Sequence, residues 1–229
     1  MDDPVQLQTC ADKFAEAGSC LPGIVGHVDA LVQPISRPGD VGMEQSVYND
    51  YKRNHAVKPQ GLQLPNGLWG SVFVDSGSVN DSQQLHNSGI LMRMADMWRG
   101  TARNGRDFYI VTDGGYGLGR HVIKKFVQAA NAPPLSAGKL AFNANLNRLR
   151  SGVERGFAAV NKQFAFMRFK PKMKLGLSPI TAYILMSYLL RNLLSCARAT
   201  PAVALVDGVS CLPPTMGEYL EEGRIIRSE

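Results

Sequence analysis

The chain has 229 residues, of which 45% are hydrophobic and 19% are charged. This composition supports a folded domain with a buried core and excludes a globally disordered chain, a collagen-like chain and a coiled coil. Lys and Arg outnumber Asp and Glu by 25 to 19, a net charge of +6, so a polyanion is the first class of partner to consider.

Cysteine spacing and the apolar segments limit the cellular setting. The four cysteines have no CxxC or zinc-ribbon spacing and indicate reduced thiols. The acidic start at Asp2 and Asp3 lacks the basic region of a signal peptide, so we expect an intracellular protein. The most apolar stretch, residues 180–190, is too short to span a bilayer and is predicted to be a buried helix, with no membrane partner.

The first half of the chain predicts strands and a hairpin. In order, we expect a short amphipathic helix within 1–20, a buried strand over 24–28 that ends at Asp29, a loop over 34–50, and two strands over 56–64 and 68–74. Pro65-Asn66-Gly67 joins the last two strands, and Asn-Gly tolerates the positive φ angles of a tight turn. These two strands are therefore predicted to form a hairpin.

The second half predicts mainly helices. In order, we expect a helix from about Asp81 through Trp98, a strand over 108–111, and helices over 121–130, 140–166 and 178–197, the last with Ser178 as N-cap before Pro179. This order predicts an α/β fold with a mixed sheet. We divide the chain into an N-terminal helix (1–20), a central domain (21–198) and a loosely attached tail (199–229).

Acidic residues stand where predicted elements end or begin. Asp29 ends the first strand, Asp81 begins a helix after the third, and Asp113 ends the fourth, while Glu154 lies on the following long helix. Carboxyl ends of neighbouring strands meet at one edge of a sheet, and three or four carboxylates there can hold two Mg²⁺ or Mn²⁺ ions for phosphoryl transfer. The alternative is that the aspartates are ordinary cap and turn residues.

One face of the long helix is polar. Asn143, Asn147, Arg150 and Glu154 are spaced four, three and four, so they share that face. Such a face in an otherwise apolar block predicts a partner, and an arginine one turn before a carboxylate can orient it or bind a phosphate. A solvated helix face is the alternative.

These blocks resemble the Harbinger-type transposases. The similar segments are 21–38 with Asp29, 51–68 with the hairpin, 77–82 with Asp81, Thr112-Asp113-Gly114-Gly115-Tyr116-Gly117-Leu118, and the helix with Asn143, Asn147, Arg150 and Val153-Glu154-Arg155-Gly156-Phe157. Five blocks in the family's order cover about residues 21–170. Each block is weak alone, and together they are specific.

The resemblance implies a ribonuclease-H-like mixed sheet flanked by helices and a metal-dependent DDE endonuclease or transposase acting on DNA in the nucleus. It implies that Asp29, Asp113 and Glu154 form the principal triad, with Asp81 as a fourth acidic residue and Mg²⁺ or Mn²⁺ as cofactor. The candidates for DNA contact are Lys52, Arg53, His55, Lys58, Arg150 and Arg155. The interleaved basic and aromatic residues over 164–174 resemble a strand or ribbon that grips a nucleic-acid backbone, and the alternative is a solvated edge whose Phe residues enter the core.

Departures from the family pattern keep a second function open. Ala30 stands where the family commonly has Gly, and Asn80 where it commonly has His. Family members usually carry a helix-turn-helix segment before the first aspartate, and only 28 residues precede Asp29. We therefore expect a truncated or domesticated derivative that relies on a separate DNA-targeting protein, and the rival function is an inactive DNA- or protein-binding module. The oligomeric state stays open.

Overall fold

The computed structural model describes residues 4–99, 107–130, 132–199 and 211–225, apart from the side chains of 97–99. In this part of the chain seven strands form one sheet: β1 (Ile24–Ala30), β2 (Gln33–Pro34), β3 (Tyr48–Asn49), β4 (Asn54–Gln63), β5 (Trp69–Ser76), β6 (Tyr109–Thr112) and β7 (Val122–Lys124). The helices are α1 (Pro4–Glu16), α2 (Val41–Val47), α3 (Asp81–Asn87), α4 (Ile90–Arg99), α5 (Ala137–Gln163), α6 (Ile180–Arg198) and α7 (Met216–Glu221). Two 3-10 helices, η1 (Ala165–Arg168) and η2 (Lys170–Lys172), lie between α5 and α6, so the strand or ribbon expected over 164–174 is wrong.

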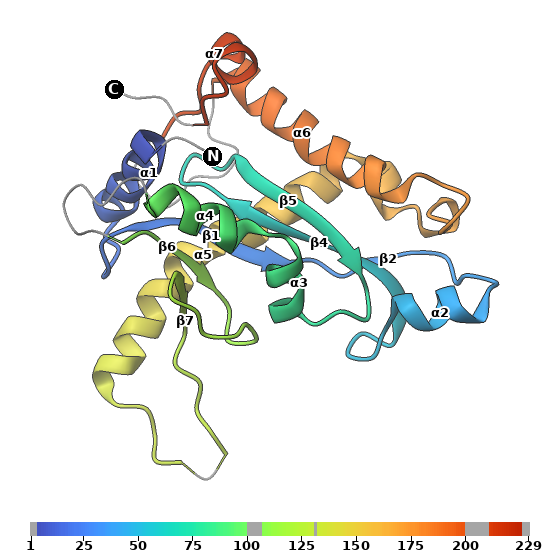
Figure 1. Ribbon diagram of the computed structural model, residues 1–229, viewed down its shortest axis with the longest axis horizontal. Coiled ribbons are helices and arrows are strands. Elements are labelled where there is room, and N and C mark those ends of the chain that lie inside the picture. The colour runs from blue at the N-terminus through green and yellow to red at the C-terminus, as the bar shows by residue number, and fades with distance from the viewer. Residues whose placement is uncertain (1–3, 100–106, 131, 200–210, 226–229) are drawn as a thin grey trace.

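The sheet is mixed, with its antiparallel and parallel parts joined at β1. Strand β4 pairs antiparallel with both β5 and β1, whereas β1, β6 and β7 run parallel (Figure 1). Helices flank this sheet, and α5 lies along it on the opposite side from α3 and α4. The architecture is consistent with a ribonuclease-H-like α/β fold, and the predicted fold class is confirmed.

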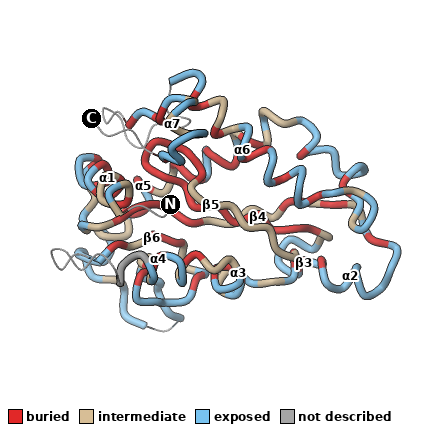
Figure 2. Tube along the Cα trace, turned by 45° about the horizontal axis from the view of Figure 1, so that its top comes forward, coloured by how far each residue is buried: buried red, intermediate tan, exposed pale blue. Residues whose placement is uncertain are grey.

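The long helix α5 supplies much of the core. Its buried apolar residues recur every three or four positions: Leu146, Leu149, Val153, Phe157 and Val160. This spacing places them on one face of the helix, which packs against β1 and β4. Figure 2 shows the resulting pattern, in which buried residues follow the strands and the inner sides of the helices.

The hairpin between β4 and β5 forms as its turn sequence predicts. Gly67 has a φ of 80°, a conformation that glycine adopts without steric cost. The side chain of Asn66 is fully buried, and its Oδ1 accepts from Leu68 N at 3.1 Å. Its Nδ2 donates to Ile225 O at 2.6 Å, so the turn also holds the C-terminal segment.

Two segments of the structure differ from their predicted secondary structure. The segment predicted as a loop over 34–50 contains α2, whose N-cap Asp40 accepts from Met43 N at 2.9 Å. The single helix predicted from Asp81 through Trp98 is two helices, α3 and α4. Gly89, with a φ of 65°, lies between them, and this left-handed conformation interrupts a helix.

The prediction of a helix over residues 121–130 is wrong. Val122–Lys124 is strand β7, and Ile110 and Val111 of β6 pair with Val122 and Ile123. Beyond β7, the backbone of Phe126 is held by a side chain of α5 rather than by local helical bonds. Partners remote in sequence therefore decide the conformation of this segment.

The C-terminal segment is packed more closely than a loose tail. Cys211 and Ile225 are buried in the core that also contains Leu7 of α1, and α7 packs on α6. Residues 200–210 and 226–229 lie outside the described part, and the division into 1–20, 21–198 and 199–229 stays a prediction. The four cysteines are free thiols, as expected.

Helix α6 forms close to its predicted bounds, with a different start. Ser178 does not cap it; its Oγ donates to Lys172 O at 2.9 Å, and Pro179 occupies the N-cap position without a side-chain cap. Within the described residues, α6 is the one helix that is long and apolar enough to cross a membrane by length and composition. Only 39% of its most apolar window of 18 residues is buried inside the protein, so the prediction of a buried helix is wrong for its outer face.

Asn192 of α6 forms hydrogen bonds to the backbone of the edge strand β5. Its buried amide accepts from Trp69 N and donates to Trp69 O, both at 2.9 Å, and it also donates to the Tyr219 hydroxyl of α7 at 2.9 Å. We expect Asn192→Ala to lower the free energy of unfolding by about 3 kcal/mol, because two buried backbone groups lose their partner. Urea unfolding measures this loss, with the exposed Asn87→Ala as a control expected within about 0.5 kcal/mol of the unmodified protein. A loss below about 1 kcal/mol for Asn192→Ala would contradict this role.

Candidate active site

Asp29 and Asp113 occupy equivalent positions on neighbouring parallel strands. His27 of β1 is in register with Val111 of β6, so each aspartate follows two residues later at the carboxyl end of its strand. Asp29 is the sixth residue of the seven-residue β1, and Asp113 comes directly after β6. The expected convergence at one edge of the sheet is therefore present for this pair.

Glu154 is linked to Asp29 through Arg150. The Arg150 Nη1 atom lies 3.0 Å from Asp29 Oδ2, and its Nη2 atom lies 2.6 Å from Glu154 Oε1. The arginine side chain is 15% exposed and that of Asp29 is 19% exposed, whereas that of Glu154 is 58% exposed. The Arg150 guanidinium therefore connects the Asp29 carboxylate of β1 to the Glu154 carboxylate of α5.

The rest of the polar face of α5 holds the segment after β7. Asn143 accepts from Phe126 N at 2.9 Å and donates to Phe126 O at 2.8 Å, and Asn147 accepts from Lys125 Nζ at 2.9 Å. The polar face therefore has the partners that its spacing predicts. These bonds fix the axial position of α5, and with it the position of Glu154, relative to the sheet.

Asp81 approaches the same edge from the other side of the sheet. It is the first residue of α3, which Asn80 caps by accepting from Gln83 N at 2.9 Å. Its Oδ1 lies 2.5 Å from Lys58 Nζ of β4, and the lysine side chain is only 6% exposed. Lys58, predicted to contact DNA, is thus an ion-pair partner of a candidate carboxylate.

Gly115 lies between two of the carboxylates. A Cβ atom at this position would come 3.2 Å from Asp113 Oδ1 and 3.7 Å from Asp81 Oδ2. The two oxygens are therefore separated by no more than the sum of those distances. The Gly115 backbone N also donates to Asp113 Oδ1 at 2.7 Å, which fixes the carboxylate over the turn.

Tyr116 is a buried residue of the site for which the sequence analysis predicts no role. Its ring is 1% exposed, and its hydroxyl accepts from Gln60 Nε2 at 3.1 Å. Burial raises the pKa of Tyr116 far above its usual value, and the charges of Asp81, Asp29 and Asp113 raise it further. The position of Tyr116 in the Asp113-Gly114-Gly115-Tyr116 block is the sequence signal that could have identified it as a site residue.

The electrostatics of Asp29 show that the carboxylates share one region. Burial raises the pKa of Asp29 to about 6. Arg150 and the Ala30 N–H group, which donates at 2.9 Å, act in the opposite direction. The negative charges of Asp113 and Glu154 add to the rise, so both carboxylates lie close enough to Asp29 to interact with it electrostatically.

The sequence matches the DDE superfamily endonuclease family over residues 28–192, which is more than half of the chain. The chain belongs to this family. No curated protein and no solved structure gives a significant match.

DDE superfamily endonucleases generally use divalent metals, and the donor chemistry of this member fits that requirement. Four carboxylates supply the hard oxygen ligands that Mg²⁺ and Mn²⁺ prefer, and a cation would relieve the repulsion around Asp29. In the described residues, however, no three Asp, Glu, His or Cys side chains are grouped to hold an ion. Arg150 and Lys58 instead form ion pairs with three of the four carboxylates.

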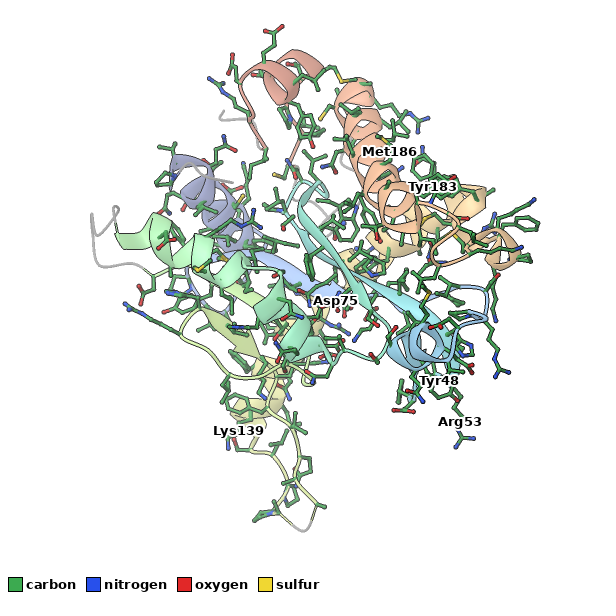
Figure 3. The ribbon with its side chains drawn as sticks, turned by 45° about the vertical axis from the view of Figure 1, so that its right-hand side comes forward. Tyr48, Arg53, Asp75, Lys139, Tyr183 and Met186 are labelled. Carbon is green, nitrogen blue, oxygen red and sulfur yellow. The ribbon has the colours of Figure 1, made fainter. Side chains whose placement is uncertain are left out.

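Of the other predicted DNA-contacting residues, Lys52, Arg53 and His55 lie around the turn between β3 and β4, and Arg155 lies on α5. Arg53, with a φ of 50°, lies in the turn between β3 and β4 and points outward near Tyr48 (Figure 3). In the same region the Lys52 ammonium lies 4.9 Å from the Tyr51 ring centre, and His55 Nε2 lies 3.3 Å from Glu44 Oε1. Arg155, on α5 beside Glu154, donates to Ser151 Oγ at 3.2 Å. Three of the six predicted DNA contacts therefore lie around the turn between β3 and β4. Arg155 lies on α5, and Lys58 and Arg150 lie within the carboxylate site.

Proposed function

We propose that the protein is a metal-dependent DNA endonuclease of the transposase type, with Asp29, Asp113 and Glu154 as principal carboxylates and Asp81 as a fourth. The observation that carries this proposal is the alignment of Asp29 and Asp113 on adjoining parallel strands, with Glu154 connected to Asp29 through Arg150. Membership of an endonuclease family supports it. The resemblance of the five sequence blocks favours the Harbinger type.

The proposed reaction breaks a DNA phosphodiester bond by in-line attack. The oxygen of water or of a DNA 3′-hydroxyl forms a new bond to phosphorus, its proton passes to solvent, and the bridging oxygen leaves with a proton. Bound Mg²⁺ or Mn²⁺ would activate the attacking oxygen and stabilise the leaving oxygen. Asp29, Asp113, Glu154 and Asp81 would hold the metal, and the rigid turn at Gly115 would keep Asp113 in position.

DNA is the proposed substrate and the nucleus the proposed location. Residues 139–174 contain nine Lys and Arg residues and one acid, Glu154, which concentrates the positive charge of the chain around a candidate catalytic carboxylate. Lys52, Arg53, His55 and Arg155 are proposed to contact phosphates. A separate DNA-targeting protein is proposed to supply site selection.

One observation favours a second function, an inactive DNA- or protein-binding module. Arg150 and Lys58 already form ion pairs with Asp29, Glu154 and Asp81. A domesticated protein could retain this arrangement for stability alone. Metal binding and DNA cleavage therefore discriminate between the two functions.

The test is nicking of supercoiled plasmid DNA by the purified chain. We expect nicking with Mn²⁺ or Mg²⁺, its loss when EDTA is added, and its loss in Glu154→Gln, which removes a metal ligand while keeping the shape of the side chain. Glu16→Gln makes the same chemical change at an exposed position on α1, so it is the matched control and should retain full nicking. Equal nicking by the unmodified protein and by Glu154→Gln would refute the assigned site. Metal-independent DNA binding without nicking would favour the inactive module.

A further inference from the structure

Lys58 of β4 is a buried lysine with two fixed acceptors at the start of α3. Its side chain is only 6% exposed. The Nζ atom donates to Val79 O at 2.8 Å and to Asp81 Oδ1 at 2.5 Å, so one ammonium group spans the turn that leads into the helix. Burying an ammonium group is costly unless it is paired and hydrogen-bonded, and both conditions are met here.

The two carboxylate oxygens of Asp81 have different surroundings. Oδ1 accepts from Lys58, whereas Oδ2 lies 3.7 Å from the position that a Cβ atom of Gly115 would occupy. That position is 3.2 Å from Asp113 Oδ1, and it is more than 4 Å from Asp81 Oδ1. The oxygen of Asp81 that faces Asp113 is therefore the one that Lys58 leaves free.

Further hydrogen bonds hold the start of α3 against β4. The side chain of Gln84 is fully buried, and its Nε2 atom donates to Lys58 O at 2.5 Å. From β4, Gln60 Nε2 donates to Asp81 O at 3.4 Å and to the Tyr116 hydroxyl at 3.1 Å. These bonds fix the backbone on both sides of the ion pair, so the main freedom left to Asp81 is rotation of its carboxylate. The ammonium group of Lys58 restricts that rotation.

We propose that Lys58 is a positioning residue of the metal site. By holding Oδ1, its ammonium group keeps Oδ2 of Asp81 turned toward Asp113, so that these two carboxylates can hold one Mg²⁺ or Mn²⁺ ion between them. Asp81 is then a ligand through a single oxygen. The inference rests on the proposed metal-dependent function and adds to it a residue that acts through Asp81.

The position of Lys58 gives it a role different from that of Arg150. Arg150 contacts Asp29 Oδ2 and Glu154 Oε1, so it connects two proposed ligands and competes with a metal for both. Lys58 contacts a single carboxylate, through the oxygen farther from the Gly115 position. Removing its ammonium group therefore releases no oxygen between two ligands, and it leaves Asp81 free to turn away.

Isothermal titration calorimetry with Mn²⁺ tests this role without depending on nicking. We expect Lys58→Met to weaken Mn²⁺ binding about tenfold, within the range for residues that orient metal ligands. If the ammonium group acted only through its charge, its removal would tighten Mn²⁺ binding instead. Lys13→Met is the matched control and should bind Mn²⁺ as the unmodified chain does, because it removes an ammonium group that is 11% exposed and paired with Glu16 on α1.

A second variant keeps the test decisive if Lys58→Met does not fold. Lys58→Gln removes the charge but keeps an N–H donor for the buried Val79 O, and it should weaken Mn²⁺ binding in the same direction. Unchanged or tighter Mn²⁺ binding by the folded Lys58 variants would overturn the proposal. Absence of Mn²⁺ binding by the unmodified chain would refute the metal-dependent function itself, and this inference with it.

The Asp81→Asn background separates positioning from a general loss of structure. With Lys58 in place, the amide oxygen accepts from the ammonium group, so the NH₂ group takes the place of Oδ2 and cannot bind a metal. We expect Asp81→Asn to weaken Mn²⁺ binding and the added Lys58→Met to recover part of it, because the amide oxygen can then turn toward the ion. The same substitution thus weakens binding beside the carboxylate and strengthens it beside the amide. A further loss of Mn²⁺ affinity in the double variant would show a general structural effect and overturn the positioning role.

Discussion

Replacing Arg150 with glutamine is expected to tighten Mn²⁺ binding about tenfold, a gain of about 1.4 kcal/mol. The Arg150 guanidinium contacts both Asp29 and Glu154, so a metal ion must compete with it for the same carboxylate oxygens. Glutamine keeps a polar side chain but removes the competing charge. Isothermal titration calorimetry of the purified chain measures the effect without depending on activity.

The same substitution is expected to lower the stability of the metal-free protein by about 2 kcal/mol. Removing one partner of a fully buried ion pair costs about 3–5 kcal/mol, and the exposure of Glu154 reduces that figure here. Saturating Mn²⁺ should recover the loss, because a ligand that binds only the folded state stabilises it. Urea unfolding in EDTA and in Mn²⁺ measures both, with Lys162→Gln on the same helix as control. Weaker Mn²⁺ binding by Arg150→Gln would mean that the arginine supports the metal site rather than competing for it.

The parts of the fold that could be predicted from sequence are those with local causes. The β4–β5 hairpin follows from Asn66-Gly67, where glycine adopts the positive φ that the turn requires. The helix α5 follows from apolar residues that repeat every three or four positions. In both cases the decisive interactions lie within a few residues of the sequence that signals them.

The elements that could not be predicted depend on remote partners. The sequence over 121–130 is compatible with a helix, but β6 supplies backbone pairing to Val122–Lys124, and Asn143 holds Phe126. The outer face of α6 was wrongly expected to be buried, because hydropathy alone does not show which side of an apolar helix packs against the rest of the protein. The packing of segments remote in sequence, rather than local propensity, determines these features.

The candidate site also contains features that could be predicted from the sequence and features that depend on remote partners. The convergence of Asp29 and Asp113 could be predicted because strand ends in a parallel pair meet at one edge. The ion pair between Lys58 and Asp81 could not, since it joins β4 to the start of α3 across 23 positions. Tyr116 was missed for the same reason: its burial among three aspartates arises only when β1, α3 and the turn after β6 come together. The assignment of metal ligands stays a prediction.

A single methyl group at Gly115 is expected to weaken metal binding and nicking about 10–100-fold, the range found for disturbed neighbours of metal ligands. In Gly115→Ala the added Cβ lies 3.2 Å from Asp113 Oδ1 and 3.7 Å from Asp81 Oδ2, so it intrudes on the space between two proposed ligands. The first of these contacts is tight enough to displace the Asp113 carboxylate by a few tenths of an ångström. Manganese titration and plasmid nicking measure the two effects separately.

Gly117→Ala is the matched control, because it adds the same methyl group to the same turn. Its Cβ would meet only Ser82, at 3.6 Å from Oγ, which is an ordinary contact. The loss of backbone entropy in the unfolded chain is similar in the two variants. A difference in Mn²⁺ affinity or nicking between them is therefore caused by the methyl group beside the carboxylates and not by a stiffer turn. If both variants bind Mn²⁺ as the unmodified protein does, the metal does not lie between Asp81 and Asp113. The site would then be confined to Asp29, Asp113 and Glu154, with Asp81 serving only as the ion-pair partner of Lys58.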